Sequence, residues 1–388
     1  MCFLERAQNK MTSKKSSSKP SVAIVCDWLT IMGGGELVTL RLQKLFPGSP
    51  IYTSVYDKER LKQFNHLDVR TTSLQKLLPK FLRYKHQLWP VFRPKAFRKL
   101  DLSDYDIIIS SCSAEAKQVQ KTRPDQIHVA YIHTPIRYYW SHYEEFKNEF
   151  NFGPLTPFIR PVIPMFVKMM RNVDLESIDG VDVFIANSEI TRDRIKKYYG
   201  RNSLVVHPPV DIGRWTPPPK TKREGYIIWG RHVPYKRFDL AIEAANKAGF
   251  KLTIIGTGPD TERLKKLAGP TVEFTGRISD EELVKRAHYA KAFLFPNEED
   301  FGIAAVEALA AGLPVIAYAK GGALDIVQNN ETGILFHEQT TDALIEAIKK
   351  SQKIDFLPAT MHRKSKKFAD TLFDNKIRKI VADTYSKK

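Results

Sequence analysis

The chain has 388 residues, of which 43% are hydrophobic and 27% are charged, and its formal net charge is +18. These proportions lie near the averages of globular proteins and exclude a largely disordered chain. The three cysteines are unclustered, which fits neither a disulfide framework nor a zinc site and favours a reducing cytoplasm.

Two stretches decide what the sequence predicts about membranes. Residues 1–20 are polar and lack the apolar run of a secretory signal, so we expect a flexible leader. The most apolar later stretch, 154–170, is interrupted by prolines, Arg160 and Lys168, whereas a spanning helix needs about 20 apolar residues. The sequence therefore predicts a cytoplasmic protein with no membrane-spanning helix.

Short apolar runs rich in β-branched and aromatic residues alternate with helical patterns in two series. The first series lies at 21–27, 50–56, 106–113, 128–133 and 181–188, and the second at 225–231, 251–256, 272–276, 291–296, 314–318 and 333–336. Runs that are apolar on both faces are typical of buried parallel strands. The alternation of strand and helix predicts an α/β fold with two Rossmann-like doubly wound domains that face a cleft.

The domain boundaries follow from these two series, because a chain of this length exceeds what one hydrophobic core usually supports. We expect an N-terminal domain at 21–207 and a C-terminal domain at 225–361. Prolines between them predict a linker at 208–224. The last residues, 362–388, are predicted to form a helix that packs back across the N-terminal domain.

The positive charge is concentrated in residues 62–99, where ten Lys and Arg residues face one acidic residue, Asp68, among aromatic side chains and leucines. This composition suits the headgroup layer of an anionic membrane. A solvated helical face over a core stripe is an alternative, and a nucleic-acid contact is a third. The basic side chains that we expect to face a membrane include Lys80, Arg83, Arg93, Lys95 and Arg98.

A run of three glycines at 33–35 follows the first predicted strand and precedes a helical pattern. Glycines there allow backbone amides at a helix N-terminus to approach a diphosphate, and Gly34 and Gly35 are the candidates. The spacing is not that of a nicotinamide-binding fingerprint. An ordinary tight turn remains the alternative.

The segment YIHTPIRYYW at 131–140 lies at the carboxyl end of a predicted central strand. Ligands of open α/β sheets bind at that edge, so we expect His133 and Arg137 to project into the cleft. A structural histidine is the alternative. The segment GRHVPYKR at 230–237 ends the first strand of the second domain, and Arg231 and Lys236 are suited to a leaving diphosphate or, alternatively, form a solvated basic loop.

The segment EEDFGIAAVEALAAGLPVIA at 298–317 is the most specific pattern. It places Glu299 before a helix that begins near Gly302, and Glu307 in the second turn of that helix. The amides of Phe301, Gly302 and Ile303 are expected to face donor phosphates, because the N-terminus of a helix favours an anion. The carboxylates can accept hydrogen bonds from sugar and ribose hydroxyls.

These motifs together resemble the large retaining glycosyltransferase family numbered four, also called glycosyl transferases group 1, whose members share the GT-B fold. The resemblance covers about 22–336 and includes ANSEITRDRI at 186–195, GTGPD at 256–260 and GGALDIV at 321–327. The segment at 131–140 is similar to that of bacterial mannosyl- and rhamnosyltransferases of surface polysaccharide assembly.

The resemblance implies a role for each candidate residue. Arg231 and Lys236 would hold the donor diphosphate, Glu299 the hydroxyls of the donor sugar, Glu307 the nucleotide ribose and His133 the wall beside the transferred sugar. It also implies a retaining reaction without a metal ion, and no Asp-x-Asp motif follows a predicted strand. We therefore expect no cofactor or metal.

The resemblance further favours GDP-mannose as donor, a glycan or polyprenyl-diphosphate-linked acceptor, and a peripheral position on the inner face of the cell membrane. A UDP-sugar donor is the alternative within the family. A basic nucleic-acid-binding protein is the alternative from another class, although no RNP, KH or helix-turn-helix signature occurs. A binding-only relative would lack Glu299, Glu307, Arg231 or Lys236.

Overall fold

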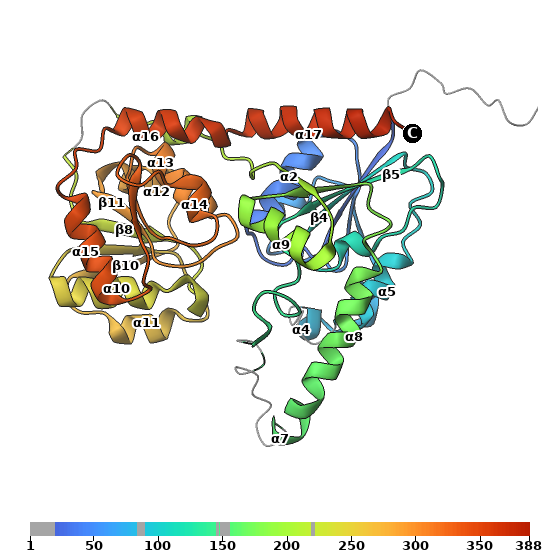
Figure 1. The fold of residues 1–388 in the computed structure, drawn as a ribbon, viewed down its shortest axis with the longest axis horizontal. Helices are drawn as coiled ribbons and strands as arrows, with labels where there is room; N and C mark the ends of the chain where they lie inside the picture. Colours follow the sequence, from blue (N-terminus) through green and yellow to red (C-terminus); the bar gives the residue numbers. More distant parts are fainter. Residues whose placement is uncertain (1–19, 84–89, 145–146, 148–155, 219–221) are drawn as a thin grey trace, which may run out of the picture.

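The computed structural model describes residues 20–83, 90–144, 147, 156–218 and 222–388. Two parallel sheets, each in its own domain, organise these residues (Figure 1). The predicted leader, 1–20, lies outside the described residues except for Pro20. The predicted α/β class with two doubly wound domains is confirmed.

The N-terminal sheet has seven strands in the order β3-β2-β1-β4-β5-β6-β7, all paired in parallel. Its strands are β1 (Val22–Cys26), β2 (Ile51–Thr53), β3 (Val69–Thr71), β4 (Ile107–Cys112), β5 (Ile127–Ile132), β6 (Val183–Ala186) and β7 (Ser203–Val205). The helices of this half are α2 (Gly34–Leu45), α3 (Leu74–Leu77), α4 (Lys80–Arg83), α5 (Phe92–Arg98), α7 (Thr156–Ile159), α8 (Ile163–Leu175) and α9 (Glu189–Tyr199).

The C-terminal sheet has six parallel strands in the order β10-β9-β8-β11-β12-β13. Its strands are β8 (Tyr226–Trp229), β9 (Leu252–Ile255), β10 (Val272–Gly276), β11 (Ala292–Phe295), β12 (Val315–Tyr318) and β13 (Gly333–Phe336). The helices are α10 (Phe238–Ala248), α11 (Thr261–Leu267), α12 (Asp280–Tyr289), α13 (Ile303–Ala310), α14 (Ala323–Ile326), α15 (Thr341–Ser351), α16 (Pro358–Ser365) and α17 (Asp370–Tyr385).

The strand order reverses between β1 and β4 in one sheet and between β8 and β11 in the other. In open α/β sheets these switch points open a crevice beyond the carboxyl ends of the strands, because the connections leave in opposite directions. The glycine run follows β1, and the segments GRHVPYKR and EEDFG follow β8 and β11. The topology therefore places the candidate motifs at two switch points.

Each sheet is buried on both faces, which explains why its central strands are mostly apolar. Two apolar clusters cover the N-terminal sheet, one built around Ile24 and Val129 and the other around Val25 and Ala130. Alternate residues of one strand thus enter different clusters, as the pleat requires. The edge strands β3 and β7 were missed by sequence analysis because each has three residues and is partly exposed.

The predicted linker, 208–224, is anchored to the C-terminal domain over part of its length. Its turn Gly213–Trp215 buries Trp215, whose ring stacks on that of Trp229 with centroids 5.8 Å apart. The prolines prevent helix and strand, but they do not prevent packing. Residues 219–221 lie outside the described part of the chain.

The C-terminal segment differs from the predicted single helix at 362–388. Helix α16 begins at Pro358, a 3₁₀ turn follows at Lys366–Phe368, and α17 begins at Asp370 after an extended Ala369. The break lets α16 pack on α13 of the C-terminal domain while α17 lies along the N-terminal domain, as the red helices of Figure 1 show.

Helix α17 docks through both apolar and charged contacts. Phe373 is buried, and its ring meets the edge of Tyr131 in β5 with centroids 5.8 Å apart. Arg41 of α2 forms ion pairs with Asp370 at 2.7 Å and Asp374 at 2.6 Å. The last helix is therefore part of the N-terminal core, although it follows the C-terminal domain in the chain.

We expect Phe373→Ala to lower the free energy of unfolding of the N-terminal domain by about 3–5 kcal/mol, because it leaves a cavity under α17. Its neighbour Leu372 is exposed, so Leu372→Ala should change this free energy by less than about 0.5 kcal/mol. Urea unfolding followed by tryptophan fluorescence measures both. Equal effects of the two substitutions would contradict the docking of α17 through Phe373.

Candidate active site

The glycine run and the first turn of α13 meet across the gap between the domains. A methyl group added at Gly34 would lie 3.1 Å from Cδ1 of Ile303, and one at Gly35 would lie 3.5 Å from Nε2 of His133. A side chain at Gly34 would therefore fill the space between the domains, and one at Gly35 would press against His133 of the same domain. The structure brings together four of the predicted site residues, Gly34, Gly35, His133 and Ile303.

His133 follows β5, and its ring is held by the neighbouring strand. Its Nε2 lies 2.8 Å from Oγ of Ser111, and its backbone N–H donates to the carbonyl of Cys112 at 2.8 Å. Burial lowers the pKa of His133 to about 4, against a smaller opposing effect of Asp300. The imidazole is therefore neutral near pH 7 and can exchange hydrogen bonds without carrying charge.

Lys236 and Glu299 form the central ion pair of the site. Nζ of Lys236 lies 2.6 Å from Oε1 of Glu299, and both side chains are largely buried. The amide of Asn297 also donates to Oε1 of Glu299, at 3.0 Å. Burial opposes the charge of Lys236, but the carboxylate of Glu299 raises its pKa, so the ammonium group persists.

Backbone packing fixes the position of Glu299. Its carbonyl accepts a hydrogen bond from the N–H of Gly322 at 2.8 Å. A methyl group at Gly322 would lie 2.1 Å from the carbonyl of Phe301, which no backbone could accommodate. The GGALDIV segment therefore supports the loop that carries Glu299 and Phe301, because the two backbones approach closely. Sequence analysis did not assign this role.

Helix α13 begins at Ile303 after Gly302, which has φ of 104°, a region that glycine adopts at low cost. No side chain caps this helix. Its first amides are thus available for an anion, and the helix dipole favours negative charge at this end. Phe301 and Gly302 are buried here, and Ile303 is partly exposed.

Glu307 lies further along α13, and its Oε2 accepts a hydrogen bond from Nε1 of Trp229 at 3.1 Å. Burial raises the pKa of Glu307 to about 7, and the bond from Trp229 opposes this shift. Arg231 is exposed on the loop after β8. Its guanidinium group thus lies at the surface, in contrast to the largely buried pair of Lys236 and Glu299.

Two arginines of the N-terminal domain reach the segment that carries Glu299. Nε of Arg137 donates to Oδ2 of Asp300 at 3.0 Å, and Arg194 of α9 pairs with Oδ1 of Asp300. Arg194 also pairs with Glu298 at 3.0 Å. Sequence analysis placed Arg137 in the cleft but missed Arg194 and Asp300, because paired charges on different domains leave no spacing signal.

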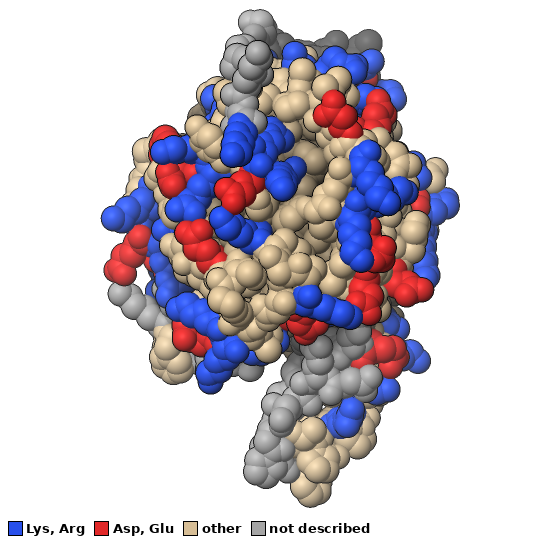
Figure 2. Space-filling view, turned by 90° about the vertical axis from the view of Figure 1, so that its left-hand side faces the viewer, with Lys and Arg blue, Asp and Glu red and all other residues tan. Residues whose placement is uncertain are grey.

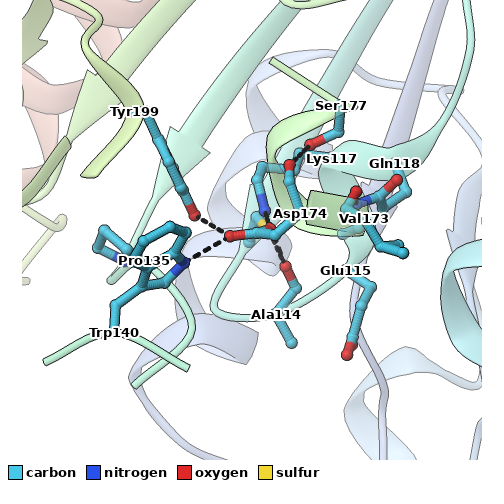
Figure 3. A network of polar contacts seen from close by, with 12 residues as sticks. Ala114, Glu115, Lys117, Gln118, Pro135, Trp140, Val173, Asp174, Ser177 and Tyr199 are labelled. Carbon is cyan, nitrogen blue, oxygen red and sulfur yellow. Dashed lines mark hydrogen bonds and ion pairs between the residues drawn. The ribbon is translucent and has the colours of Figure 1, made fainter. Parts of the chain in front are cut away.

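A buried polar network supports the loop that carries His133 and Arg137 (Figure 3). Asp174, at the end of α8, pairs with Lys117 and accepts hydrogen bonds from Nε1 of Trp140 at 2.8 Å and from the hydroxyl of Tyr199 at 2.9 Å. A buried carboxylate with this many donors is costly to disturb. The network therefore fixes Trp140, the last residue of YIHTPIRYYW, against α8 and α9.

Among the described residues, no group of three or more His, Cys, Asp or Glu side chains is arranged to hold a metal ion. In the same part of the chain, no helix combines the length and the apolar character needed to cross a membrane.

Residues 212–368, which span α13, Lys236 and both carboxylates, match the family model described as Glycosyl transferases group 1. The resemblance inferred from the sequence motifs is thereby confirmed for the half of the chain in which the most specific of them lie.

Curated relatives match in the same way over part of their length. A GDP-mannose-dependent alpha-(1-6)-phosphatidylinositol monomannoside mannosyltransferase of Mycobacterium tuberculosis is 32% identical over 218 residues, which cover 48% of this chain and 56% of that protein. A D-inositol 3-phosphate glycosyltransferase of Nocardioides is 27% identical over 198 residues, 41% and 43% of the two chains. The chain thus spans about half the length of these relatives.

Solved structures match over nearly the whole chain. Anabaena Alr3699/HepE in complex with UDP and glucose has a TM-score of 0.67 at 16% identity, with 94% of this chain and 100% of that chain covered. Sucrose-phosphate synthase from Thermosynechococcus elongatus has a TM-score of 0.72 at 16% identity, with 95% and 100% covered. These likenesses show the fold and confirm the expected GT-B arrangement.

The raised pKa of Glu307 predicts a pH dependence of ligand binding. A carboxyl group with a pKa of about 7 is mostly protonated at pH 6 and mostly ionised at pH 8. On the ribose-binding role that the resemblance implies for Glu307, only the ionised group accepts hydrogen bonds from two ribose hydroxyls, so KM for a nucleotide sugar should fall about tenfold between pH 6 and pH 8. Steady-state kinetics across this range measures it.

The Glu307→Gln variant is the control, because its neutral amide cannot ionise and its KM should vary little with pH. The raised pKa of Glu307 also makes the free energy of unfolding depend on pH, and this free energy falls as the pH rises. Because the folded-state pKa lies above the unfolded value, the stability contribution of Glu307 is full below about pH 4.5 and is lost as the pH rises through 7. A wild-type KM profile in Glu307→Gln would show that another group titrates.

Proposed function

We propose that this protein is a retaining, metal-independent glycosyltransferase that transfers a hexose from a nucleotide-diphosphate sugar to a glycan or a polyprenyl-diphosphate-linked acceptor in cell-surface polysaccharide synthesis. The observation that carries the proposal is the buried pair of Lys236 and Glu299 beside the uncapped N-terminus of α13. This arrangement lies at a switch point of the sheet and opposite His133 of the other domain.

The pair suits a sugar diphosphate because one partner is a cation and the other an acceptor. The ammonium group of Lys236, assisted by Arg231 and the first amides of α13, would bind the diphosphate as negative charge grows on the leaving group. Glu299 would exchange part of its contact with Lys236 for the hydroxyls of the donor sugar. Glu307 would accept hydrogen bonds from the ribose.

The acceptor would approach from the N-terminal domain. His133 is neutral near pH 7 and lies at the wall of the gap, so it would contact the transferred sugar as a hydrogen-bonding group rather than as a cation. In a retaining transfer on one face of the sugar, a phosphate oxygen of the leaving group takes the proton of the acceptor hydroxyl. No separate protein base is required for that step.

A hollow of about 180 Å³ in the N-terminal domain is a candidate position for part of the acceptor. Its lining is mainly polar and comprises Thr30, Val55, Tyr56, Asp57, Lys58, Glu59, Gln75 and Arg83. Thr30, which lines the hollow, lies three residues before the glycine run in the sequence. Mixed charges and hydroxyl groups suit a sugar or a phosphate.

Mannose from GDP-mannose is the preferred donor. Support comes from the names of the relatives that match at 32% identity, which are GDP-mannose-dependent mannosyltransferases. The UDP-bound neighbours match at 16–17% identity and carry only the fold. A UDP-hexose is therefore the second candidate, and it would use the same diphosphate contacts.

The basic side chains of 62–99 that were expected to face a membrane are only partly available for this contact. Arg93 is buried and paired with Glu115 at 2.8 Å, and Arg98 bonds to Gln118 at 3.0 Å, so neither is available to lipids. Within the same segment, Lys62, Lys76, Lys95 and Lys99 are exposed. The side chain of Lys80 lies outside the described part of the structure.

A second candidate for the membrane contact is apolar. It lies on the arm, which consists of α7, the turn Arg160–Val162 and α8. Phe158 is 77% exposed and Met165 is 71% exposed, and Val162 and Met169 continue the same stripe at helical spacing. The arm projects from the N-terminal domain (Figure 1), and its tip at the bottom of Figure 2 is largely uncharged. Residues 156–173 hold three basic and no acidic residues, which suits an anionic membrane.

Substitution of the central pair tests the proposed chemistry. We expect Lys236→Ala and Glu299→Ala each to lower turnover of GDP-mannose by at least about 100-fold, comparable with the loss of one donor to a developing oxyanion. The exposed Lys266 gives a control, Lys266→Ala, that should keep the wild-type rate. Transfer of radiolabelled mannose to extracted polyprenyl-linked glycans measures the rate, and thermal shift against a nucleotide-sugar panel identifies the donor.

His133→Ala should slow transfer while affinity for the nucleotide stays within about twofold of wild type, because the ring faces the sugar and not the base. Titration calorimetry with GDP and steady-state kinetics separate the two effects. A folded Glu299→Ala protein with wild-type turnover would refute the proposed function, and unchanged kinetics of His133→Ala would remove His133 from the site.

The arm is tested with vesicles of phosphatidylglycerol and phosphatidylcholine in a flotation assay. Phe158→Ser combined with Met165→Ser should weaken binding at least about tenfold, because each exposed apolar side chain contributes about 1.5 kcal/mol or more when buried in lipid. The matched control, Leu204→Ser with Leu357→Ser, removes two exposed leucines elsewhere and should bind like wild type. Equal flotation of both double variants would exclude the arm as the membrane contact.

A further inference from the structure

Three consecutive acidic residues, Glu298, Glu299 and Asp300, follow β11 in a segment that is neither helix nor strand. The outer two face the N-terminal domain, where they pair with Arg194 and Arg137. The middle one faces Lys236 and Asn297 within its own domain. Successive side chains of this segment thus point to opposite sides, so the carboxylate of Glu299 is directed away from those of Glu298 and Asp300.

Asp300 is the most enclosed member of the set. It is 8% exposed, and each of its carboxylate oxygens pairs with a different guanidinium group of the N-terminal domain. Burial alone would raise its pKa, but Arg137 and Arg194 hold the pKa of Asp300 below its usual value. Loss of either partner of such a buried ion pair is strongly destabilising, because the remaining charge is neither paired nor hydrated.

The two arginines belong to the N-terminal domain, and one of them also contacts the C-terminal loop that carries Lys236. Arg137 lies on the loop that follows β5 and carries His133, and its guanidinium group stacks over the ring of Tyr235, 5.5 Å from the centroid. Arg194 is 9% exposed and belongs to α9, whose first turn is capped by Ser188. A further contact joins α9 to a different element of the C-terminal domain, because the backbone N–H of Glu189 donates to Oδ2 of Asp325 in α14 at 2.9 Å.

We propose that Arg137 and Arg194 are positioning residues, which grip Glu298 and Asp300 and thereby place Glu299 in the donor-sugar site only when the two domains are together. The inference rests on the proposed function for the identity of the ligand. It adds that the donor site of the C-terminal domain is completed by the N-terminal domain, through residues that do not touch the donor.

A positioning role and a purely structural contact between the domains predict different effects on ligand affinity. Glu299 is proposed to meet the sugar, whereas the nucleotide contacts Glu307, Lys236 and the amides of α13. Loss of the clamp should therefore reduce affinity for the nucleotide sugar and kcat, while affinity for the nucleotide alone is kept. Loss of a merely structural contact would weaken both ligands equally.

The experiment compares Asp300→Asn, Arg137→Gln and Arg194→Gln with the control Arg192→Gln. Arg192 lies two residues before Arg194 on α9, is exposed, and pairs with Glu189 and Asp193 of its own helix. We expect kcat of the three clamp variants to fall about 10- to 100-fold, since a displacement of about 1 Å at a reacting group has this effect. Titration with GDP should give affinities within about twofold of wild type, while GDP-mannose binds at least about tenfold more weakly.

The combination of Arg137→Gln with Asp300→Asn should cost less than the product of the two single losses, because both remove the same contact. Arg137→Lys keeps the charge but not the two-pronged geometry, and its kcat should lie between those of wild type and Arg137→Gln. Wild-type kcat and KM in Asp300→Asn, or equal losses of GDP and GDP-mannose affinity, would overturn the inference. Arg137 is more exposed than Asp300, so its variants keep the test valid if Asp300→Asn does not fold.

Hydrogen exchange tests the clamp without any donor. The amides of 298–303 should exchange at least about tenfold faster in Asp300→Asn and Arg137→Gln than in wild type, and at the wild-type rate in Arg192→Gln. Unchanged exchange would refute the clamp even if the protein transfers mannose. Faster exchange in a protein that binds no nucleotide sugar would refute the proposed function and, with it, the donor role of the clamp.

Discussion

The contact between Asp300 and the arginines of the N-terminal domain is the interaction on which the rest of the site depends. The two sheets present their switch points to one another, but sheets alone do not fix the distance between two domains. A buried carboxylate held by Arg137 and Arg194 does, because both of its guanidinium partners belong to the other domain and would be lost together if the domains moved apart. The approach of Gly34 to Ile303 follows from the same contact.

The charges near the site are divided between those that hold the protein together and those available to a ligand. Arg137, Arg194 and Asp300 satisfy one another, and Lys117 and Asp174 form a second buried pair under the same loop. Lys236 and Glu299 also pair, but they lie beside the uncapped end of α13 and keep some exposure. Exchange of that one pair for a sugar diphosphate requires no change in the buried network.

Much of the fold was predictable because hydrophobic patterns record burial on both faces of a strand. The central strands β1, β4 and β5 are mostly apolar and fully buried, and their alternation with helices in the chain predicts parallel pairing. The short edge strands β3 and β7 carry no such signal. The break at Ala369 was missed as well, because no proline or glycine marks it and the turn arises from packing on two domains.

The site was predictable where its residues share one short segment. Glu299, Gly302 and Glu307 belong to one strand-loop-helix unit, so their spacing alone predicts how they lie at the start of α13. Arg194 and Asp300 are 106 positions apart, and nothing local relates them. Arg93 shows the opposite error, since a basic composition predicted a surface role for a side chain that is buried against Glu115.

A crystal structure of the protein with GDP-mannose or a non-hydrolysable analogue is the most direct test of this account. It should place the diphosphate within about 3 Å of Lys236 and the first amides of α13, with Glu299 at the sugar hydroxyls and Glu307 at the ribose. Asp300 should remain between Arg137 and Arg194 in the same crystal. A nucleotide bound away from α13, for example in the hollow beside Tyr56, would contradict the account.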